Sequence, residues 1–141
     1  MTAPLVIFHG NCLDGFGSAY AAWVYFNINQ KVAADYIPAA HGDVPPEATG
    51  KTVYLLDYAY KRVGMEQLCK QAEKVIVLDH HITAVEELAG LDDEYNNLEL
   101  LLDMDRSGAM IAWEYFHQAP VPKLIACVQD RDLWRWDIPE S

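Results

Sequence analysis

Basic residues are scarce in this chain of 141 residues, where 10 lysines and arginines stand against 21 aspartates and glutamates, for a formal net charge of −11. That charge excludes binding to duplex nucleic acid or to an anionic membrane by electrostatic attraction alone. Cysteine is scarce too, and the three present form no Cys-x-x-Cys pair. The odd number and the spacing argue against a disulfide framework and against a zinc site made of thiolates.

Long apolar runs are also missing. No stretch approaches the roughly 20 apolar residues of a transmembrane helix. The first residues, MTAPLVIFHGN, lack the basic segment of a signal peptide. With 52% hydrophobic residues, 8 glycines and 7 prolines, the composition excludes a disordered or low-complexity chain. We expect one folded domain in the reducing cytoplasm, large enough to be stable without disulfides.

Short apolar runs alternate with amphipathic runs along the chain. The apolar runs predict strands at Leu5–Phe8, Asp35–Ile37, Val53–Leu56, Val75–Leu78 and Leu98–Leu102. The other runs predict helices at Gly15–Phe26, Lys61–Lys70, Thr83–Leu88, Ser107–Phe116 and Lys123–Val128, and a proline-containing loop at His41–Gly50. Continuously apolar strands are typical of a sheet covered on both faces. The pattern therefore predicts an α/β fold, a three-layer α/β/α arrangement with a mainly parallel sheet of about five strands.

Polar residues follow several of these strands, and ligands of parallel sheets bind beyond the carboxyl ends of the strands. The first strand leads into HGNCLDG (9–15), a tight turn that offers His9 and Asp14 and opens a helix. Without a ligand this segment would be an ordinary βα turn. Asp57 follows the next clear strand, where it could equally be a helix N-cap. The triplet DHH (79–81) follows the strand after that, and packing does not explain an aspartate and two histidines at this edge.

Two later segments add further candidates. Arg106 and Ser107 stand at the start of a predicted helix, where they could bind an anion together with its free N–H groups. Alternatively, Ser107 is only the N-cap of that helix. Asp130 lies near the carboxyl end of the last predicted helix, against the helix dipole, and therefore calls for a cation. Asp132 competes with it for the same role.

These segments together supply three carboxylates and two imidazoles, enough to hold two divalent ions bridged by one carboxylate. The candidate ligands are His9, Asp14, Asp57, His80 and Asp130. Two ions about 3.5–4 Å apart can activate a water and stabilise both ends of a displacement at phosphorus. Bound cations would also reverse the local negative charge, so that an acidic protein could hold a phosphate ester.

The same segments, in this order, resemble the motifs of the DHH phosphoesterase superfamily, which includes manganese-dependent inorganic pyrophosphatases, single-strand exonucleases and nanoRNases. DHH (79–81) resembles motif III, HGNCLDGFGSA (9–19) motif I, and LD (56–57) motif II. DRDLW (130–134) looks like the last acidic motif in the form of an oligoribonuclease-like branch. The resemblance extends over residues 5–136.

The resemblance implies a role for each matching residue. His9 and Asp14 would be ligands from motif I, Asp57 the bridging ligand, and His80 and Asp130 the ligands of the second ion. Asp79 would support a ligand, and His81 would face the scissile phosphate as a donor or acid. The implied cofactor is a pair of Mn²⁺ ions, with Co²⁺, Mg²⁺ or Zn²⁺ as alternatives. The implied activity is hydrolysis of a phosphodiester or phosphoanhydride bond by a metal-activated water, in a small phosphate ester, a nucleotide or a short oligonucleotide.

Two departures from the family pattern stand out. Cys12 occupies the place of the first acid of an Asp-x-Asp pair, and a thiolate suits Mn²⁺ poorly, although Cys12 could also be a small buried apolar residue. Residues 1–141 match the metal-binding catalytic domain, and we expect the family's C-terminal substrate-binding domain to be absent. Trp134 and Trp136 would then be exposed and could support a homodimer.

Two other functions fit parts of the pattern. The chain could be a metal-binding regulatory domain without turnover. It could also be a receiver-like signalling module that is phosphorylated on Asp57, but Asp14 has no acidic neighbour and Leu102 is followed by an aspartate instead of a lysine. That function would also leave the two adjacent histidines without a role.

Overall fold

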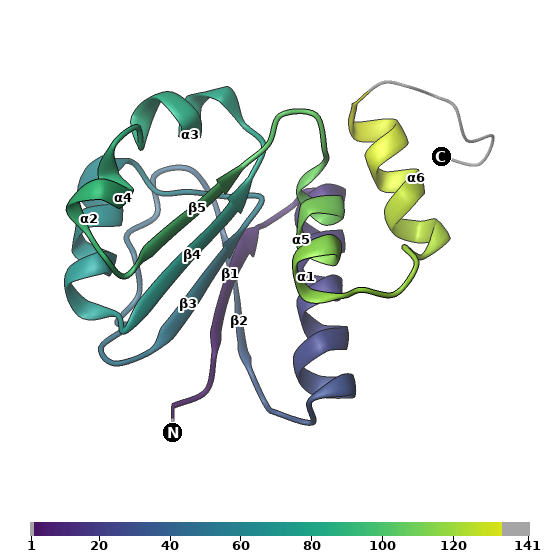
Figure 1. The fold of residues 1–141 in the computed structure, drawn as a ribbon, viewed down its shortest axis with the longest axis horizontal. Helices are drawn as coiled ribbons and strands as arrows, with labels where there is room; N and C mark the ends of the chain where they lie inside the picture. The colour runs from purple at the N-terminus through teal and green to yellow at the C-terminus, as the bar shows by residue number, and fades with distance from the viewer. Residues whose placement is uncertain (1, 134–141) are drawn as a thin grey trace.

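The sheet of this protein is entirely parallel. The computed structural model describes residues 2–133 and contains five strands in the order β2-β1-β3-β4-β5 (Figure 1). The strands are β1 (Leu5–His9), β2 (Asp35–Ala39), β3 (Thr52–Leu56), β4 (Lys74–Asp79) and β5 (Leu98–Leu102). Each adjacent pair is in parallel register, so all carboxyl ends meet at one edge.

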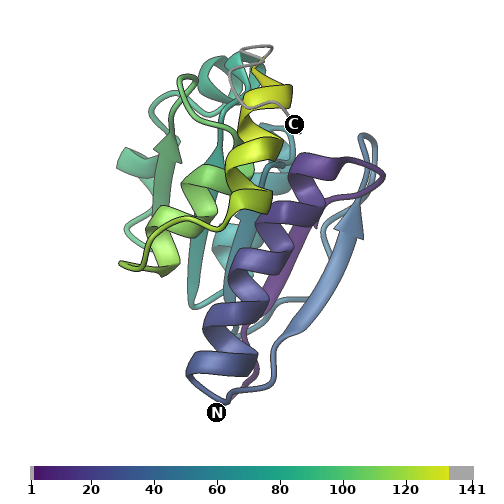
Figure 2. The same ribbon diagram turned by 90° about the vertical axis from the view of Figure 1, so that its right-hand side faces the viewer.

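Helices cover both faces of this sheet. One face carries α1 (Leu13–Trp23), which continues into a π-helix, η1 (Val24–Asn29), together with α5 (Gly108–Phe116) and α6 (Lys123–Asp132); Figure 2 looks onto this face. The opposite face carries α2 (Arg62–Gln71), α3 (Ile82–Glu87) and the short α4 (Leu91–Glu94) (Figure 1). The predicted three-layer α/β/α fold with a parallel sheet of five strands is therefore confirmed.

Two apolar cores, one on each face, explain why the strands are continuously apolar. Successive side chains of a strand point to opposite faces. Leu55 and Val77 thus belong to the core under α2, whereas Leu56 and Leu78 belong to the core under α1 and α5. All four side chains are fully buried.

Within residues 2–133, the structure has no helix that is both long and apolar enough to cross a membrane. The contact surface expected at Trp134 and Trp136 lies outside the described residues.

Glycines allow α1 to lie against its neighbours closely enough to bring its first turn to the sheet edge. A Cβ at Gly15 would overlap the carbonyl oxygen of His9, and a Cβ at Gly17 would lie 2.9 Å from the Cβ of Ala109 on α5. The first of these contacts is with backbone, which cannot move aside by changing a rotamer.

We therefore predict that Gly15→Ala lowers the free energy of unfolding by about 3 kcal/mol, at the upper end of the usual cost of overpacking. The adjacent and largely exposed Phe16 provides the matched control, since Phe16→Ala should change stability by no more than roughly 0.5 kcal/mol. Urea unfolding of both variants measures the difference. Equal stabilities would contradict the close approach of α1 to β1.

Candidate metal centre

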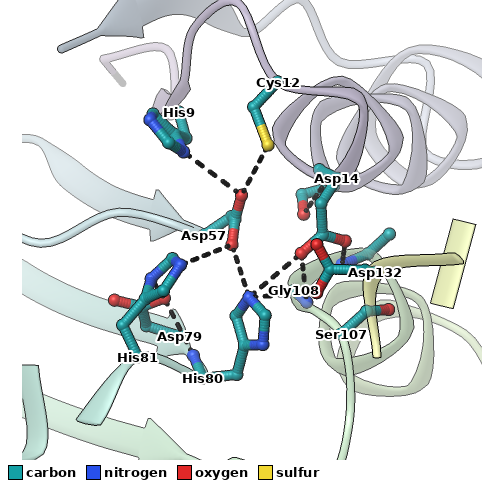
Figure 3. A network of polar contacts seen from close by, with 12 residues as sticks. His9, Cys12, Asp14, Asp57, Asp79, His80, His81, Ser107, Gly108 and Asp132 are labelled. Atoms are coloured by element: carbon teal, nitrogen blue, oxygen red, sulfur yellow. Dashed lines mark hydrogen bonds and ion pairs between the residues drawn. The ribbon is translucent and has the colours of Figure 1, made fainter. Parts of the chain in front are cut away.

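The polar residues predicted from the strand ends do meet at the carboxyl edge of the sheet (Figure 3). His9 ends β1, Asp57 follows β3, and Asp79 ends β4 and is followed by two histidines. The helices on the α1 face contribute Cys12, the N-cap residue of α1, and Asp14 in its first turn. Asp132, the last residue of α6, reaches the same cluster.

Asp57 lies at the middle of this cluster, with its two carboxylate oxygens facing different partners. Oδ2 lies 3.6 Å from Nδ1 of His9 and 3.6 Å from Sγ of Cys12. Oδ1 lies 3.0 Å from Nε2 of His80 and 3.9 Å from Nε2 of His81. Burial raises the pKa of Asp57 to about 7, since only 1% of the residue is exposed, the nearby Asp14 adds to the rise, and the contact with His80 opposes it.

The backbone of Asp57 is unusual as well. Its φ of +57° places it in the left-handed region, which aspartate tolerates better than most residues. Its N–H still donates to the carbonyl of Leu78, at 2.9 Å, so the turn occurs without loss of that hydrogen bond. Asp57 is not a helix N-cap, because the next helix begins at Arg62 with Lys61 in the cap position.

Gly108 makes room for this side chain. A Cβ at Gly108 would lie 2.7 Å from Cβ and 2.8 Å from Oδ1 of Asp57. Nothing in the sequence pattern identifies this glycine as part of the site, because the contact joins segments about 50 residues apart in a fold of crossover connections.

Asp14 ties α1 to the amino end of α5. Its Oδ2 accepts a hydrogen bond from the N–H of Gly108 at 2.9 Å, and its Oδ1 accepts one from the N–H of Ala109 at 2.8 Å. Burial alone would raise the pKa of Asp14, but the contact with His80 and these two N–H groups outweigh it, so the pKa is lowered. Asp14 is therefore held as a buried anion at a helix N-terminus.

His80 lies between these two carboxylates. Its Nε2 is 3.1 Å from Oδ2 of Asp14, 3.0 Å from Oδ1 of Asp57 and 3.7 Å from Oδ2 of Asp132. Burial favours the neutral ring, but the hydrogen bonds to Asp14 and Asp57 prevail and raise the pKa of His80 to about 10. Without another cation in the cluster, His80 therefore carries a proton at neutral pH.

His81 and Asp79 form a second pair beside the first. Nδ1 of His81 lies 2.7 Å from Oδ1 of Asp79, and the same oxygen accepts the backbone N–H of His80 at 2.8 Å. Asp79 is buried, whereas 45% of the His81 side chain is exposed. The hydrogen bond to Asp79 raises the pKa of His81 against the effect of burial. Asp79 therefore orients the ring of His81, and it contacts the predicted ligand His80 only through the backbone N–H of that residue.

The pKa of His9 is lowered, in contrast to the raised pKa values of His80 and His81. Burial lowers its pKa, and the neighbouring His41 and His81 add to this effect. Its Nδ1 is buried without a hydrogen-bond partner, because the 3.6 Å to Asp57 exceeds hydrogen-bond distance. A neutral ring with a free nitrogen is the form in which histidine binds a metal.

Three groups of side chains in the described part of the chain could hold an ion, with donor atoms within 4.8 Å of one another in each. The groups are His9, Cys12 and Asp57; Asp57, Asp79, His80 and His81; and Asp14, His80 and Asp132. Asp57 and His80 each belong to two groups, so the three are parts of one cluster. Four of the five predicted ligands are among its members.

The fifth predicted ligand, Asp130, is not among them. On α6, the carboxylate that lies near His80 belongs to Asp132, which the sequence offered as the alternative ligand to Asp130. Burial, with the nearby charge of Asp14, raises the pKa of Asp132. Asp130 is buried and has interaction partners of its own. Asp132 therefore joins the candidate ligand set on its geometry, and the role of Asp130 stays a prediction.

The anion site predicted at Arg106 and Ser107 gains no support from the geometry. Ser107 is fully buried, and its Oγ accepts the N–H of Met110, which is ordinary N-capping of α5. Asp14 already occupies the first N–H groups of that helix. Arg106 donates to Asp103 at 2.7 Å and to Glu114 at 2.9 Å instead.

A cavity of about 490 Å³ opens beside the cluster. Among its lining residues are His9, Asp57 and His81 of the cluster and, outside it, His41, Tyr58 and Lys61. The sequence did not indicate that His41, a loop residue, would line this cavity. Its ring centroid lies 5.8 Å from that of His9. His117 lies away from this cavity, half-buried, and its ring stacks on that of Trp113 with the ring centroids 3.9 Å apart.

Comparison with known proteins identifies relatives of this chain. No protein-family model matches it. Uncharacterized protein R106 of Acanthamoeba polyphaga mimivirus is 35% identical over 150 residues, which cover 97% of this chain. The chain spans only 35% of the length of that relative. An uncharacterized protein from Helicobacter pylori G27 has a similar crystal structure, with a TM-score of 0.69 over 96% of this chain and 45% of that one, and 16% identity. This likeness shows the fold alone.

The raised pKa values of His80 and Asp57 predict how the metal-free protein responds to pH. A histidine whose pKa rises from 6.5 to about 10 on folding contributes stability below about pH 6.5, and that contribution disappears as pH rises towards 10. An aspartate whose pKa rises from 3.8 to about 7 on folding likewise contributes stability at low pH, and that contribution disappears as pH rises from about 4 to 7. We therefore expect the melting temperature of chelator-treated protein to fall between pH 7 and 10. His80→Gln should flatten this decline, and an unchanged slope in that variant would contradict the assignment.

The contact between Gly108 and Asp57 gives a second prediction. Gly108→Ala should displace the Asp57 carboxylate and weaken divalent-metal binding at least about tenfold, the lower end of the cost of disturbing groups around a metal. Helix content should not change, because alanine favours helices. Glu114→Gln, an exposed change on the same helix, serves as the control. Isothermal titration with Mn²⁺ and Zn²⁺ measures the effect, and unaltered affinity in Gly108→Ala would show that Asp57 does not contribute.

Proposed function

We propose that this chain is the metal-binding catalytic part of a divalent-metal-dependent phosphoesterase, as its resemblance to the DHH phosphoesterases implies. The observation that carries the proposal is the arrangement around Asp57. One oxygen of this buried carboxylate faces His9 and Cys12, and the other faces His80 and His81. A carboxylate shared between two donor groups is what a pair of bridged ions requires.

The donor set fits divalent metal ions. Carboxylates and imidazoles are the ligands that Mn²⁺, Co²⁺ and Zn²⁺ take in proteins. The unpartnered Nδ1 of His9 and the crowding of Asp14, Asp57 and Asp132 around one histidine are both features that a bound cation would satisfy. His9, Cys12 and Oδ2 of Asp57 would hold one ion, and Asp14, His80 and Asp132 would hold the other. Oδ1 of Asp57, which lies 3.0 Å from His80, would be the ligand shared with this second ion. When bound, the ions would supply an activated water and neutralise the charge of the phosphate.

Two residues of the chain would assist the reaction, His81 as a proton donor and Asp79 by orienting it. His81 lines the cavity with its ring fixed through Nδ1 by Asp79, which leaves Nε2 as the nitrogen able to face a substrate. The hydrogen bond to Asp79 raises the pKa of His81, which favours the protonated ring, the state needed to give a proton to a leaving oxygen. Asp79 acts through His81 as a positioning residue.

Lys61 would bind the substrate phosphate, the role that the sequence suggested for Arg106. It is the lysine among the cavity's lining residues, whereas Arg106 is paired with Asp103 and Glu114. A cavity of about 490 Å³ has the size of an ordinary small-molecule site. We therefore propose a small phosphate ester, a nucleotide or the end of a short oligonucleotide as the substrate.

The receiver-like alternative is less well supported. The strand order 2-1-3-4-5 is shared with flavodoxin-like folds. However, a phosphate acceptor must be reached by the phosphodonor, and Asp57 is 1% exposed and in contact with His80. A metal-binding domain without turnover would have the same geometry, so measured turnover decides between these two functions.

Three variants of the full chain test the proposal. Hydrolysis of pyrophosphate, a cyclic dinucleotide, a short oligonucleotide and a nucleoside bisphosphate is measured with Mn²⁺, Co²⁺, Mg²⁺ or Zn²⁺. We expect His81→Ala to lower the rate by about 10²–10⁴-fold with metal content intact, as loss of a general acid does. Asp57→Asn should lose metal, and Arg106→Ala should behave like the unmodified chain.

Elemental analysis accompanies each rate. Loss of metal in His81→Ala, with unchanged activity per bound ion, would reverse the roles of the two histidines. Metal binding without turnover of any of the four substrates would favour the regulatory function instead.

A further inference from the structure

Cys12 stands in a helix-capping position but does not cap the helix. It is the N-cap residue of α1, where serine, threonine, aspartate or asparagine would accept a hydrogen bond from the first turn. The Cys12 side chain makes no capping hydrogen bond, although the N–H groups of Gly15 and Asp14 are near enough to oppose the rise that burial causes in the pKa of its thiol. The sulfur instead lies 3.6 Å from Oδ2 of Asp57, the oxygen that also faces the unpartnered Nδ1 of His9.

The backbone around Cys12 is fixed from both sides. Asn11 before it is in the left-handed region, with φ +53°, and the N–H of Gly10 donates to Ala39 at 2.8 Å. After it, the N–H of Phe16 donates to the carbonyl of Cys12 at 2.9 Å. These contacts fix the turn between β1 and α1, and the turn directs the thiol of Cys12 toward the cluster.

The surroundings of Cys12 are not those of a core cysteine. Cys69, by comparison, is buried within the apolar core under α2. Cys12 belongs to neither apolar core, is only half-buried, and has carboxylate and imidazole groups as its neighbours. The interpretation of Cys12 as a small apolar residue thus finds no support in the packing.

We propose that His9, Cys12 and Asp57 form a thiolate metal site that selects a borderline ion of the Zn²⁺ or Co²⁺ class over Mn²⁺ and Mg²⁺. One imidazole nitrogen, one sulfur and one carboxylate oxygen within 4.8 Å of one another provide a mixed donor set. Sulfur favours softer ions, whereas oxygen donors suit Mn²⁺ and Mg²⁺. On binding, the thiol proton passes to the solvent as the sulfur–metal bond forms.

The other half of the cluster lacks sulfur. Asp14, His80 and Asp132 offer two carboxylates and one imidazole, a harder donor set. The two halves therefore differ in metal preference, and the pair of ions that the proposed function calls for would be of two kinds. This inference rests on that function for the second ion, while the thiolate site itself can be tested without any substrate.

Titration of the metal-free full chain with Co²⁺ provides the test. Thiolate bound to Co²⁺ gives a ligand-to-metal charge-transfer absorption in the near ultraviolet, which carboxylate and imidazole ligands do not give. We expect this band in the unmodified chain and in Cys127→Ser, which removes a half-buried thiol on α6. We expect no band in Cys12→Ser or in Cys12→Asp.

Competition between Zn²⁺ and Mn²⁺ gives a second readout. The preference for Zn²⁺ should fall at least about tenfold in Cys12→Asp, since loss of a ligand atom costs no less than loss of a supporting group. Using both Cys12→Ser and Cys12→Asp protects the test from a folding defect in one variant, which circular dichroism would reveal.

The outcomes separate this inference from the proposed function. Bound Co²⁺ without the band in the unmodified chain, or a band that persists in Cys12→Ser, would overturn the thiolate site while leaving a phosphoesterase intact. A band without hydrolysis of any phosphate compound would support the thiolate site and count against the phosphoesterase. A chain that binds no Co²⁺ would overturn the thiolate site, and it would count against the phosphoesterase as well if Mn²⁺, Mg²⁺ and Zn²⁺ also failed to bind.

Discussion

The amino end of α5 is the constraint on which the rest of the cluster depends. The backbone of residue 108 and the side chain of Asp57 share one small volume, and glycine leaves room for both. The N–H groups of Gly108 and Ala109 are both taken by Asp14, so this carboxylate of α1 cannot rotate away. His80 then lies between two fixed acids. One helix end thereby sets the positions of groups from α1, β3 and β4.

This arrangement shifts the pKa values of two neighbouring carboxylates, Asp14 and Asp57, in opposite directions. Asp14 receives two backbone N–H groups and keeps its charge, with a lowered pKa. Asp57 is equally buried, but burial and the nearby charge of Asp14 raise its pKa. Within residues 2–133, no backbone N–H donates to its carboxylate as two do to that of Asp14. Sites that separate the pKa values of adjacent groups in this way are typical of functional centres. Asp14 is suited to be a permanent anion, and Asp57 to exchange its proton for another cation.

The elements and most of the cluster could be predicted from local sequence, since apolar runs define strands and the carboxyl ends of parallel strands meet. Contacts between distant segments could not be predicted in this way. Asp130 and Asp132 are two residues apart on α6, about 200° around a helix, so the way α6 packs on α1 and α5 decides which of them lies near His80. Nothing in the local sequence around Ser107 shows that Asp14 accepts the first N–H groups of α5. His41 reaches the cavity from a loop that has no periodic pattern.

The crossover connections have a consequence for the speed of folding. The donor groups come from positions between residue 9 and residue 132, brought together only when the parallel strands have paired in the order β2-β1-β3-β4-β5. Pairing of such distant segments is slow, because the loops must close before the contacts form. A cation that binds the finished cluster therefore arrives after the rate-limiting step. It would leave the rate of folding nearly unchanged and slow the rate of unfolding, giving the loaded protein a long kinetic lifetime.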